Sequence, residues 1–478
     1  MIGEICVRKI GKRSVLLLAS CLFVGCAVHR YRPAPIVPST TASQFESRSF
    51  ADPGLRSFEE QNLGHSVSPW PSKNWGLQTL SLAALYFNPA LDLARARLAT
   101  AEGAVITARA RPNPTFDLTP GVPAPYLLTQ DFLFPIATAG KRGLRVQIAK
   151  NLRQAAQFDL ADSAWTVAIG VRLALLNYVV AARNLELLQS EQKARADQVS
   201  ILEQILRAGE NTKSDVDLAR IELSKITASE RSVEVQVADA KSTLAIAIGV
   251  PTAAIDASDF SWPEMDTPPS ADSLSLDQVR RDAVINRLNV RRALAQYAAT
   301  EADLHSEIAK QYPNFNLGPG YTYEERNSFF TVGFSTSLPI FNRNQGPIAE
   351  AEGRREEAAA RFLQTQAQVI ENAQRAFAVY KAALSAFSQA ESAYELQKSQ
   401  LQVVQHNISA GADDRLSLDA VEIQISALAQ ARLTALASAQ KALGDLEDSV
   451  QRPLVRGEMF PVNSESLGID KLLQKRKP

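Results

Sequence analysis

Residues 199–224, VSILEQILRAGENTKSDVDLARIELS, align without a gap with residues 401–426, LQVVQHNISAGADDRLSLDAVEIQIS. Both stretches carry Ala-Gly at the same position, at Ala208-Gly209 and at Ala410-Gly411, and both keep apolar residues three and four positions apart before it. Glycine after such a run marks the end of a helix, and the spacing is that of a coiled-coil seam. The sequence therefore predicts two copies of one unit, a helical hairpin that turns at Gly209 or Gly411.

The predicted hairpins are far longer than the helices of an ordinary globular domain. Their arms lie in two stretches without proline, 136–250 and 348–452, which are rich in the residues that favour helix. An arm that stays helical from 140 to 208 extends for about 100 Å. Such an arm does not cross a membrane, because charged residues interrupt it throughout: Lys150, Arg153, Arg172, Arg183 and Glu186. We therefore expect long coiled coils outside the membrane.

The first 26 residues form a targeting segment with a basic start and an apolar core from Val15 to Val24. The core ends in LFVGC (22–26), which resembles a bacterial lipobox, so we expect cleavage before Cys26 and acylation of its thiol. All three cysteines lie in this segment, which excludes a disulfide framework in the mature chain. Ala27 after the cysteine suggests onward sorting to the outer membrane. The alternative is an ordinary signal peptide cut near Gly25.

The duplication divides the chain into six parts. We expect a lipoprotein signal peptide at 1–26, an extended N-terminal connector at 27–75 and a first structural repeat at 76–250. A linker at 251–273, a second repeat at 274–452 and a C-terminal tail at 453–478 follow. The connector is expected to be extended because prolines recur along it, among them Pro33, Pro35, Pro38, Pro53 and Pro71.

Each repeat also contains a short stretch with the alternation of a β-hairpin. In the second copy, Phe330, Val332 and Phe334 alternate with small or polar residues after a turn at 325–328. Strands of about ten residues are long enough to cross a bilayer, with those three side chains towards lipid. The alternative is a hairpin that faces water. Four strands cannot close a barrel, whereas three chains supply twelve, so the sequence favours a homotrimer.

The order of these parts resembles the TolC family of outer-membrane efflux channels. Two stretches, AGKRG (139–143) and LPIFNRNQG (338–346), resemble its CzcC-like branch, which serves heavy-metal exporters. The resemblance implies a mainly α protein with a small β part. Its homotrimeric 12-stranded outer-membrane β-barrel, four strands per chain, continues into a long periplasmic α-helical coiled-coil tunnel. It also implies partners: a periplasmic adaptor, contacted by the hairpin tips at Gly209 and Gly411, and an inner-membrane RND-type pump.

The resemblance further implies an acidic gate where the hairpins turn. Asp215 matches a family acid after the first turn, while the equivalent residue of the second copy is Ser417. Asp413, Asp414 and Asp419 are then the candidates at the second turn, and threefold symmetry would arrange each as a ring of carboxylates that attracts cations. The alternative is that these aspartates cap helix N-termini, where they satisfy free N–H groups.

Four cations precede or begin the long helices: Lys141, Arg142, Arg145 and Arg343. Positive charge in the first turn of a helix opposes the helix dipole. We expect these side chains to lie just below the barrel and to contact anionic lipid headgroups of the outer membrane. The alternative is a set of salt bridges to neighbouring helices.

No pattern in the chain favours catalysis, a cofactor or a bound metal. The four histidines are scattered without ligand spacing, and Lys plus Arg equal Asp plus Glu at 51 each, which disfavours nucleic acid. We expect a passive export duct, lipid-anchored at the periplasmic face of the outer membrane, with heavy-metal cations as its cargo. The alternatives are a duct for drug efflux or type I secretion, and a lipidated periplasmic adaptor.

Overall fold

The computed structural model describes residues 30–121, 127–271, 274–324 and 326–454. The chain divides into two compact units, Met1–Ser47 and Arg48–Pro478. The described part of the first unit contains one short helix, α2 (Pro38–Glu46). The predicted signal peptide, Cys26 and most of the C-terminal tail lie outside the described residues.

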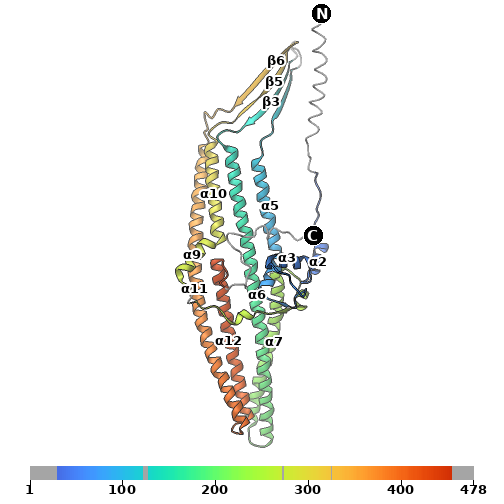
Figure 1. The fold of residues 1–478 in the computed structure, drawn as a ribbon, viewed down its shortest axis with the longest axis vertical. Coiled ribbons are helices and arrows are strands. Elements are labelled where there is room, and N and C mark those ends of the chain that lie inside the picture. The colour runs from blue at the N-terminus through green and yellow to red at the C-terminus, as the bar shows by residue number, and fades with distance from the viewer. Residues whose placement is uncertain (1–29, 122–126, 272–273, 325, 455–478) are drawn as a thin grey trace. The chain divides into compact units, whose positions relative to one another are not determined.

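The second unit contains the same six elements twice in the same order (Figure 1). The first set is α4 (Leu77–Phe87), α5 (Pro89–Arg109), β2 (Thr115–Gly121), β3 (Leu127–Ile136), α6 (Lys141–Arg207) and α7 (Lys213–Ile248). The second set is α9 (Leu276–Asn286), α10 (Leu288–Ala309), β5 (Phe315–Glu324), β6 (Asn327–Thr336), α11 (Gln345–Ser409) and α12 (Arg415–Val450). The predicted duplication and the mainly helical fold with four strands are confirmed.

The long helices of this unit lie side by side and form a wall (Figure 1). On the side of the strands, α6 packs between α5 and α10, and α10 packs on α11. Towards the hairpin turns, α6 packs between α7 and α12, and α12 packs on α11. The order is therefore α5–α6–α10–α11 in one half and α7–α6–α12–α11 in the other. Only α6, of 67 residues, and α11, of 65, run through both halves.

The four strands form one antiparallel sheet in the order β2–β3–β5–β6. The two hairpins join through β3 and β5, where Phe134 lies opposite Leu317. Because side chains alternate along a strand, the register places the large apolar residues on one face. This apolar face carries Phe116, Leu118, Phe132, Phe134, Leu317, Phe330, Val332 and Phe334. The opposite face carries mainly small and polar side chains.

The strand lengths differ slightly from the prediction. β3, β5 and β6 have ten residues each and β2 has seven. Asn327 and Ser328, predicted to lie in the turn, instead begin β6, while Glu325 lies outside the described residues. The predicted alternation is confirmed. Phe330 is 88% and Val332 78% exposed in the protomer, which is favourable only where lipid covers them.

The prediction of an extended connector over 27–75 is wrong. It contains α2 and α3 (Pro53–Leu63), each with its proline in the first turn, where the missing N–H costs nothing. The Asp52 side chain caps α3 by accepting from the Gly54 and Leu55 N–H groups, at 2.7 and 3.3 Å. The prolines therefore begin helices here instead of preventing them.

Residues 48–75 and the linker, all within the second unit, build a small layer against the middle of the helical wall. Strand β1 (Asn74–Trp75) of the connector pairs in parallel with β4 (Asp259–Phe260) of the linker. The linker also contains α8 (Thr252–Asp256) and a 3₁₀ turn, η1 (Pro263–Asp266). Phe58 and Trp75 belong to the same buried cluster as Trp165 of α6. Among the described helices, α6 alone has a stretch apolar and long enough to span a membrane, but 61% of it is buried in this core.

Candidate functional site

The two hairpin turns have the same backbone geometry. Gly209 and Gly411 adopt the left-handed conformation, with φ of +81° and +72°. Each glycine N–H donates to the carbonyl three residues earlier, Leu206 or Ile408, at 3.0 Å. The next N–H in each turn reaches the carbonyl five residues earlier, at Ile205 or Asn407. These bonds satisfy the last carbonyls of α6 and α11, so the turns predicted at Gly209 and Gly411 are confirmed.

Two of the four predicted gate aspartates, Asp215 and Asp414, cap helices. The Asp215 carboxylate accepts from the Thr212 N–H and hydroxyl, while the Thr212 hydroxyl accepts from the Asp215 N–H. Asp414 precedes α12 and accepts from the Ser417 N–H at 2.8 Å, and Asp413 accepts from the Asp414 N–H at 3.0 Å. Hydrogen bonds from Ser417 hold the pKa of Asp414 below its ordinary value. Asp215, Asp413 and Asp414 stay near the surface of the turns. Their hydrogen bonds therefore leave their charge free to face the axis of a trimer.

Asp419 contradicts the expectation that it takes part in a gate. Its side chain is 0% exposed in the protomer, so its carboxylate cannot line a water-filled axis in this conformation. Arg415 lies 3.1 Å from it and also pairs with Asp197 of α6 at 3.3 Å. Burial raises the pKa of Asp419, and Arg415 opposes this effect. Arg415 therefore connects the second hairpin to the first close to the turns.

Within the described residues, the two cations that begin α6 contact the ends of neighbouring helices and form no salt bridge, while their contact with lipid stays a prediction. Lys141 donates to the Tyr312 carbonyl and to Asn314 Oδ1, just past the end of α10. Arg142 donates from Nε and Nη2 to the Arg109 carbonyl at the end of α5, at 2.9 and 2.7 Å. Both cations thus neutralise the negative C-terminal ends of neighbouring helices, which explains positive charge at the start of α6.

The other two predicted cations remain apart from these contacts. Arg145 lies one turn further along α6 and is exposed. Arg343 precedes α11, and its backbone N–H donates to Gln345 Oε1 at 2.8 Å. The structure adds Lys310 at the end of α10, which sequence reasoning missed because Lys310 and Lys141 are distant in the chain. The charge of Lys310 contributes, after burial, to lowering the pKa of Lys141.

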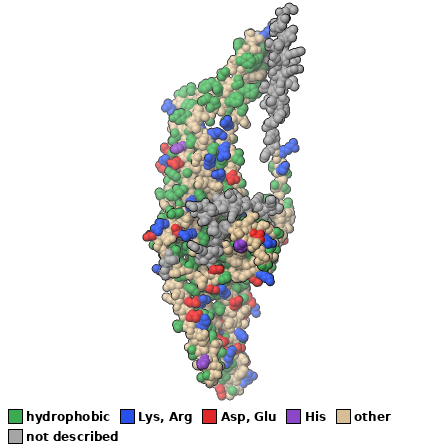
Figure 2. Space-filling model, in the orientation of Figure 1, with side chains coloured by type: hydrophobic (Ala, Val, Ile, Leu, Met, Phe, Trp, Pro, Cys, Tyr) green, Lys and Arg blue, Asp and Glu red, His purple; other side chains and the backbone are tan. Residues whose placement is uncertain are grey.

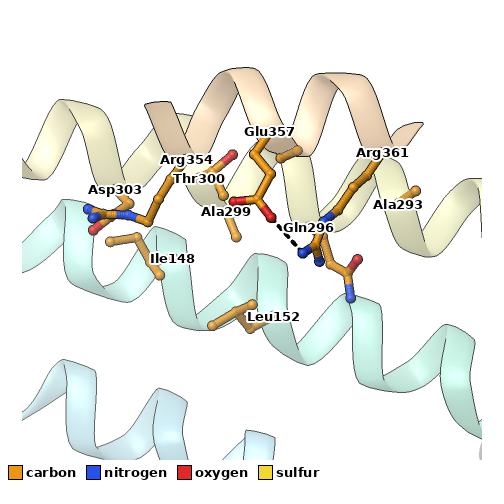
Figure 3. A pocket seen from close by; sticks show the side chains of 11 residues that line it. Ile148, Leu152, Ala293, Gln296, Ala299, Thr300, Asp303, Arg354, Glu357 and Arg361 are labelled. Atoms are coloured by element: carbon orange, nitrogen blue, oxygen red, sulfur yellow. Dashed lines mark hydrogen bonds and ion pairs between the residues drawn. The ribbon is translucent and has the colours of Figure 1, made fainter. Parts of the chain in front are cut away.

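A groove of about 430 Å³ runs over α10 between α6 and α11. Figure 3 shows its charged side chains, which come from α10 and α11 and form two pairs. Arg354 contacts Asp303 at 2.8 Å, and Arg361 contacts Glu357 at 2.5 Å. Because each charge is neutralised, the groove has the character of a helix interface. Among the described residues, no group of three or more His, Cys, Asp or Glu could hold a metal ion.

Residues 279–450, which extend from α9 to the end of α12, match the family described as Outer membrane efflux protein. The match covers most of the second repeat. The apolar face of the sheet and the helical wall are the parts that a channel of this family needs.

One curated relative and two solved structures are similar to this chain. The cobalt-zinc-cadmium resistance protein CzcC of Cupriavidus metallidurans is 25% identical over 339 residues, which cover 68% of this chain and 77% of that protein. The CmeC outer membrane channel of Campylobacter jejuni superimposes with a TM-score of 0.64 at 13% identity, covering 94% and 98% of the two chains. CusC superimposes with a TM-score of 0.62 at 16% identity, covering 89% and 99%.

Proposed function

We propose that three copies of this chain form a closed duct that exports heavy-metal cations from the periplasm to the outside. The duct receives its cargo from an inner-membrane RND-type pump, through an adaptor that contacts the turns at Gly209 and Gly411. CzcC supports the cargo class, since its name assigns it to cobalt, zinc and cadmium resistance.

The observation that supports this proposal is that the sheet and the helical wall have their open edges in the same two places. The sheet ends at β2 and β6. In the chain, β2 follows α5, and β6 leads into α11. The helical wall ends at the same two helices on the side of the strands. Because an open sheet edge is not tolerated in lipid, a further copy must add at β2 and α5 and another at β6 and α11. Three copies supply twelve strands, which is within the range of known barrels.

The cargo is tested by deleting the gene in its own host and measuring growth on metals and on drugs. We expect reduced tolerance of cobalt, zinc and cadmium, restored by the gene in trans. Unchanged metal tolerance together with increased sensitivity to drugs would assign the duct to drug efflux.

We also propose that Cys26 carries the lipid that anchors the mature chain. Because a single buried acyl chain holds a protein only marginally, we expect several on this cysteine. Feeding labelled fatty acid to cells that express wild type or Cys26→Ser should label the wild-type protein only. Equal labelling of the two proteins contradicts the lipid anchor.

We propose that the aspartates at the turns, Asp215, Asp413 and Asp414, also form a gate for cations. Asn caps a helix about as well as Asp but has no charge, so Asp413→Asn/Asp414→Asn separates the two roles. We expect trimers of unchanged stability and a loss of cation preference in single-channel conductance across a lipid bilayer. Asp215→Asn provides the matched change at the first turn. If the double variant keeps the cation preference and divalent-cation block of wild type, the two aspartates act as caps alone.

A further inference from the structure

A large pocket lies where the strands meet the helices. Its volume is about 1040 Å³, and Lys141 and Arg145 of α6, Lys310 of α10 and the segment 337–342 before α11 contribute to its lining. We call it the junction pocket. Its charged lining comes from α6 and from α10 with the residue that follows it, and these two helices lie between the edge helices α5 and α11.

The junction pocket has an excess of positive charge. Lys310 is neutralised by Glu307 at 2.5 Å, and the one acidic residue of the lining, Asp303, is neutralised by Arg354 at 2.8 Å. The other two cations have no carboxylate: Lys141 donates to neutral oxygens, and Arg145 has no ion pair or hydrogen bond within the described part of the chain. Burial and the charge of Lys310 lower the pKa of Lys141, so an anion would relieve both costs.

The same pocket has an apolar side that is continuous with the sheet. Ile136, the last residue of β3, lines it and lies on the same face as Phe134 and Phe132. Leu338 and Phe341 also line it, and they are 69% and 96% exposed. Figure 2 shows hydrophobic side chains over the strands and a group of Lys and Arg side chains just below them. Large apolar side chains at such exposure indicate contact with lipid at this level.

We propose that the junction pocket binds the phosphate headgroup of an anionic phospholipid from the inner leaflet of the outer membrane. Its acyl chains run along the apolar face of the sheet, past Ile136 and Phe134. Strands of ten residues cross the hydrocarbon layer, so their ends lie at the level of the headgroups. Arg145 forms a bidentate contact with the phosphate, and Lys141 supplies a second charge. This inference goes beyond the duct, because it would hold for a channel of any cargo.

The proposal is tested by native mass spectrometry of trimers purified from outer membranes, with phosphatidylglycerol as the added probe. We expect up to three retained lipids per wild-type trimer, one for each chain. Arg145→Gln should weaken retention by about fivefold, the factor that one cation near an anionic surface contributes. Among the described residues Arg145 has no ion-pair or hydrogen-bond partner, so its replacement removes no such contact there.

Lys150→Gln is the matched control, because it removes the same charge from an exposed position of α6 outside the junction pocket. It should retain phosphatidylglycerol as wild type does. Equal retention by Arg145→Gln and wild type overturns the proposal. Competition by inorganic phosphate at the concentration at which the lipid binds would also overturn it, since it would show a site for a soluble anion.

Discussion

Arg172→Met should lower the free energy of unfolding by about 3–5 kcal/mol, because it leaves a buried carboxylate without its cation. The Arg172 and Glu447 side chains are 3% and 1% exposed, and Arg172 Nη1 lies 3.6 Å from Glu447 Oε2. Arg172 also donates to Gln440 Oε1 at 2.9 Å, and its guanidinium lies 4.8 Å from the centre of the Trp262 ring. One side chain thus joins α6, α12 and the linker.

The position of Gly444 in α12 is explained by the same arrangement. A Cβ at Gly444 would lie 3.3 Å from Arg172 Nε, so a larger residue would press on the guanidinium. The remaining contacts complete the network: Gln440 Nε2 donates to the Met265 carbonyl, and the Leu454 N–H donates to Glu447 Oε1. Removing Arg172 therefore disrupts the contacts through which α6, α12 and the linker pack together.

The expected loss is measured by urea unfolding of detergent-solubilised protein, in a double-mutant cycle with Glu447→Gln. Because Arg172→Met/Glu447→Gln removes both charges, it should recover a large part of the stability lost by Arg172→Met alone. A loss below about 1 kcal/mol for the single variant would show that Glu447 finds another partner or takes up a proton.

Much of this fold is predictable from sequence because its information is local and repeated. The turns at Gly209 and Gly411 follow from a glycine placed after an apolar period, and the duplication confirms each turn by the other. The strand faces follow from the alternation around Phe330 and Phe334. None of these features depends on which distant segment packs against them, so pattern and register suffice.

The residues that sequence reasoning misplaced depend on contacts between distant segments. Asp217 and Asp419 occupy equivalent positions of the two repeats, yet the Asp217 side chain is 49% exposed and that of Asp419 is buried. The contacts of Lys141 and Arg142 with carbonyls at the ends of α10 and α5 join segments that are distant in the chain, so no sequence pattern reveals them. The prediction for the connector was wrong for a local reason. Proline prevents a helix in its interior but is favoured in its first turn.

Glu59 of α3 makes the stability of the layer depend on pH. Its side chain is 0% exposed, and neither carboxylate oxygen has a hydrogen-bond partner within the described residues. Burial raises the pKa of Glu59 to about 8. Below the ordinary glutamate pKa the folded and unfolded forms both hold the proton, so the group has no effect there. Above it only the folded form holds the proton, so stability falls as the pH rises towards 8 and stays low beyond it.

Comparing wild type with Glu59→Gln isolates this effect, because Gln has the same shape and does not titrate. We expect similar free energies of unfolding at pH 5, with Glu59→Gln more stable than wild type by roughly 3 kcal/mol at pH 7 and 4–5 kcal/mol at pH 9. Urea unfolding at the three pH values measures the difference. Glu60→Gln is the matched control on the same helix, since a hydrogen bond from Arg56 lowers the pKa of Glu60. In this variant the stability should still fall as the pH rises from 5 to 9. If the stabilities of wild type and Glu59→Gln change in parallel from pH 5 to 9, Glu59 has a partner or water contact that keeps it ionised in the folded protein.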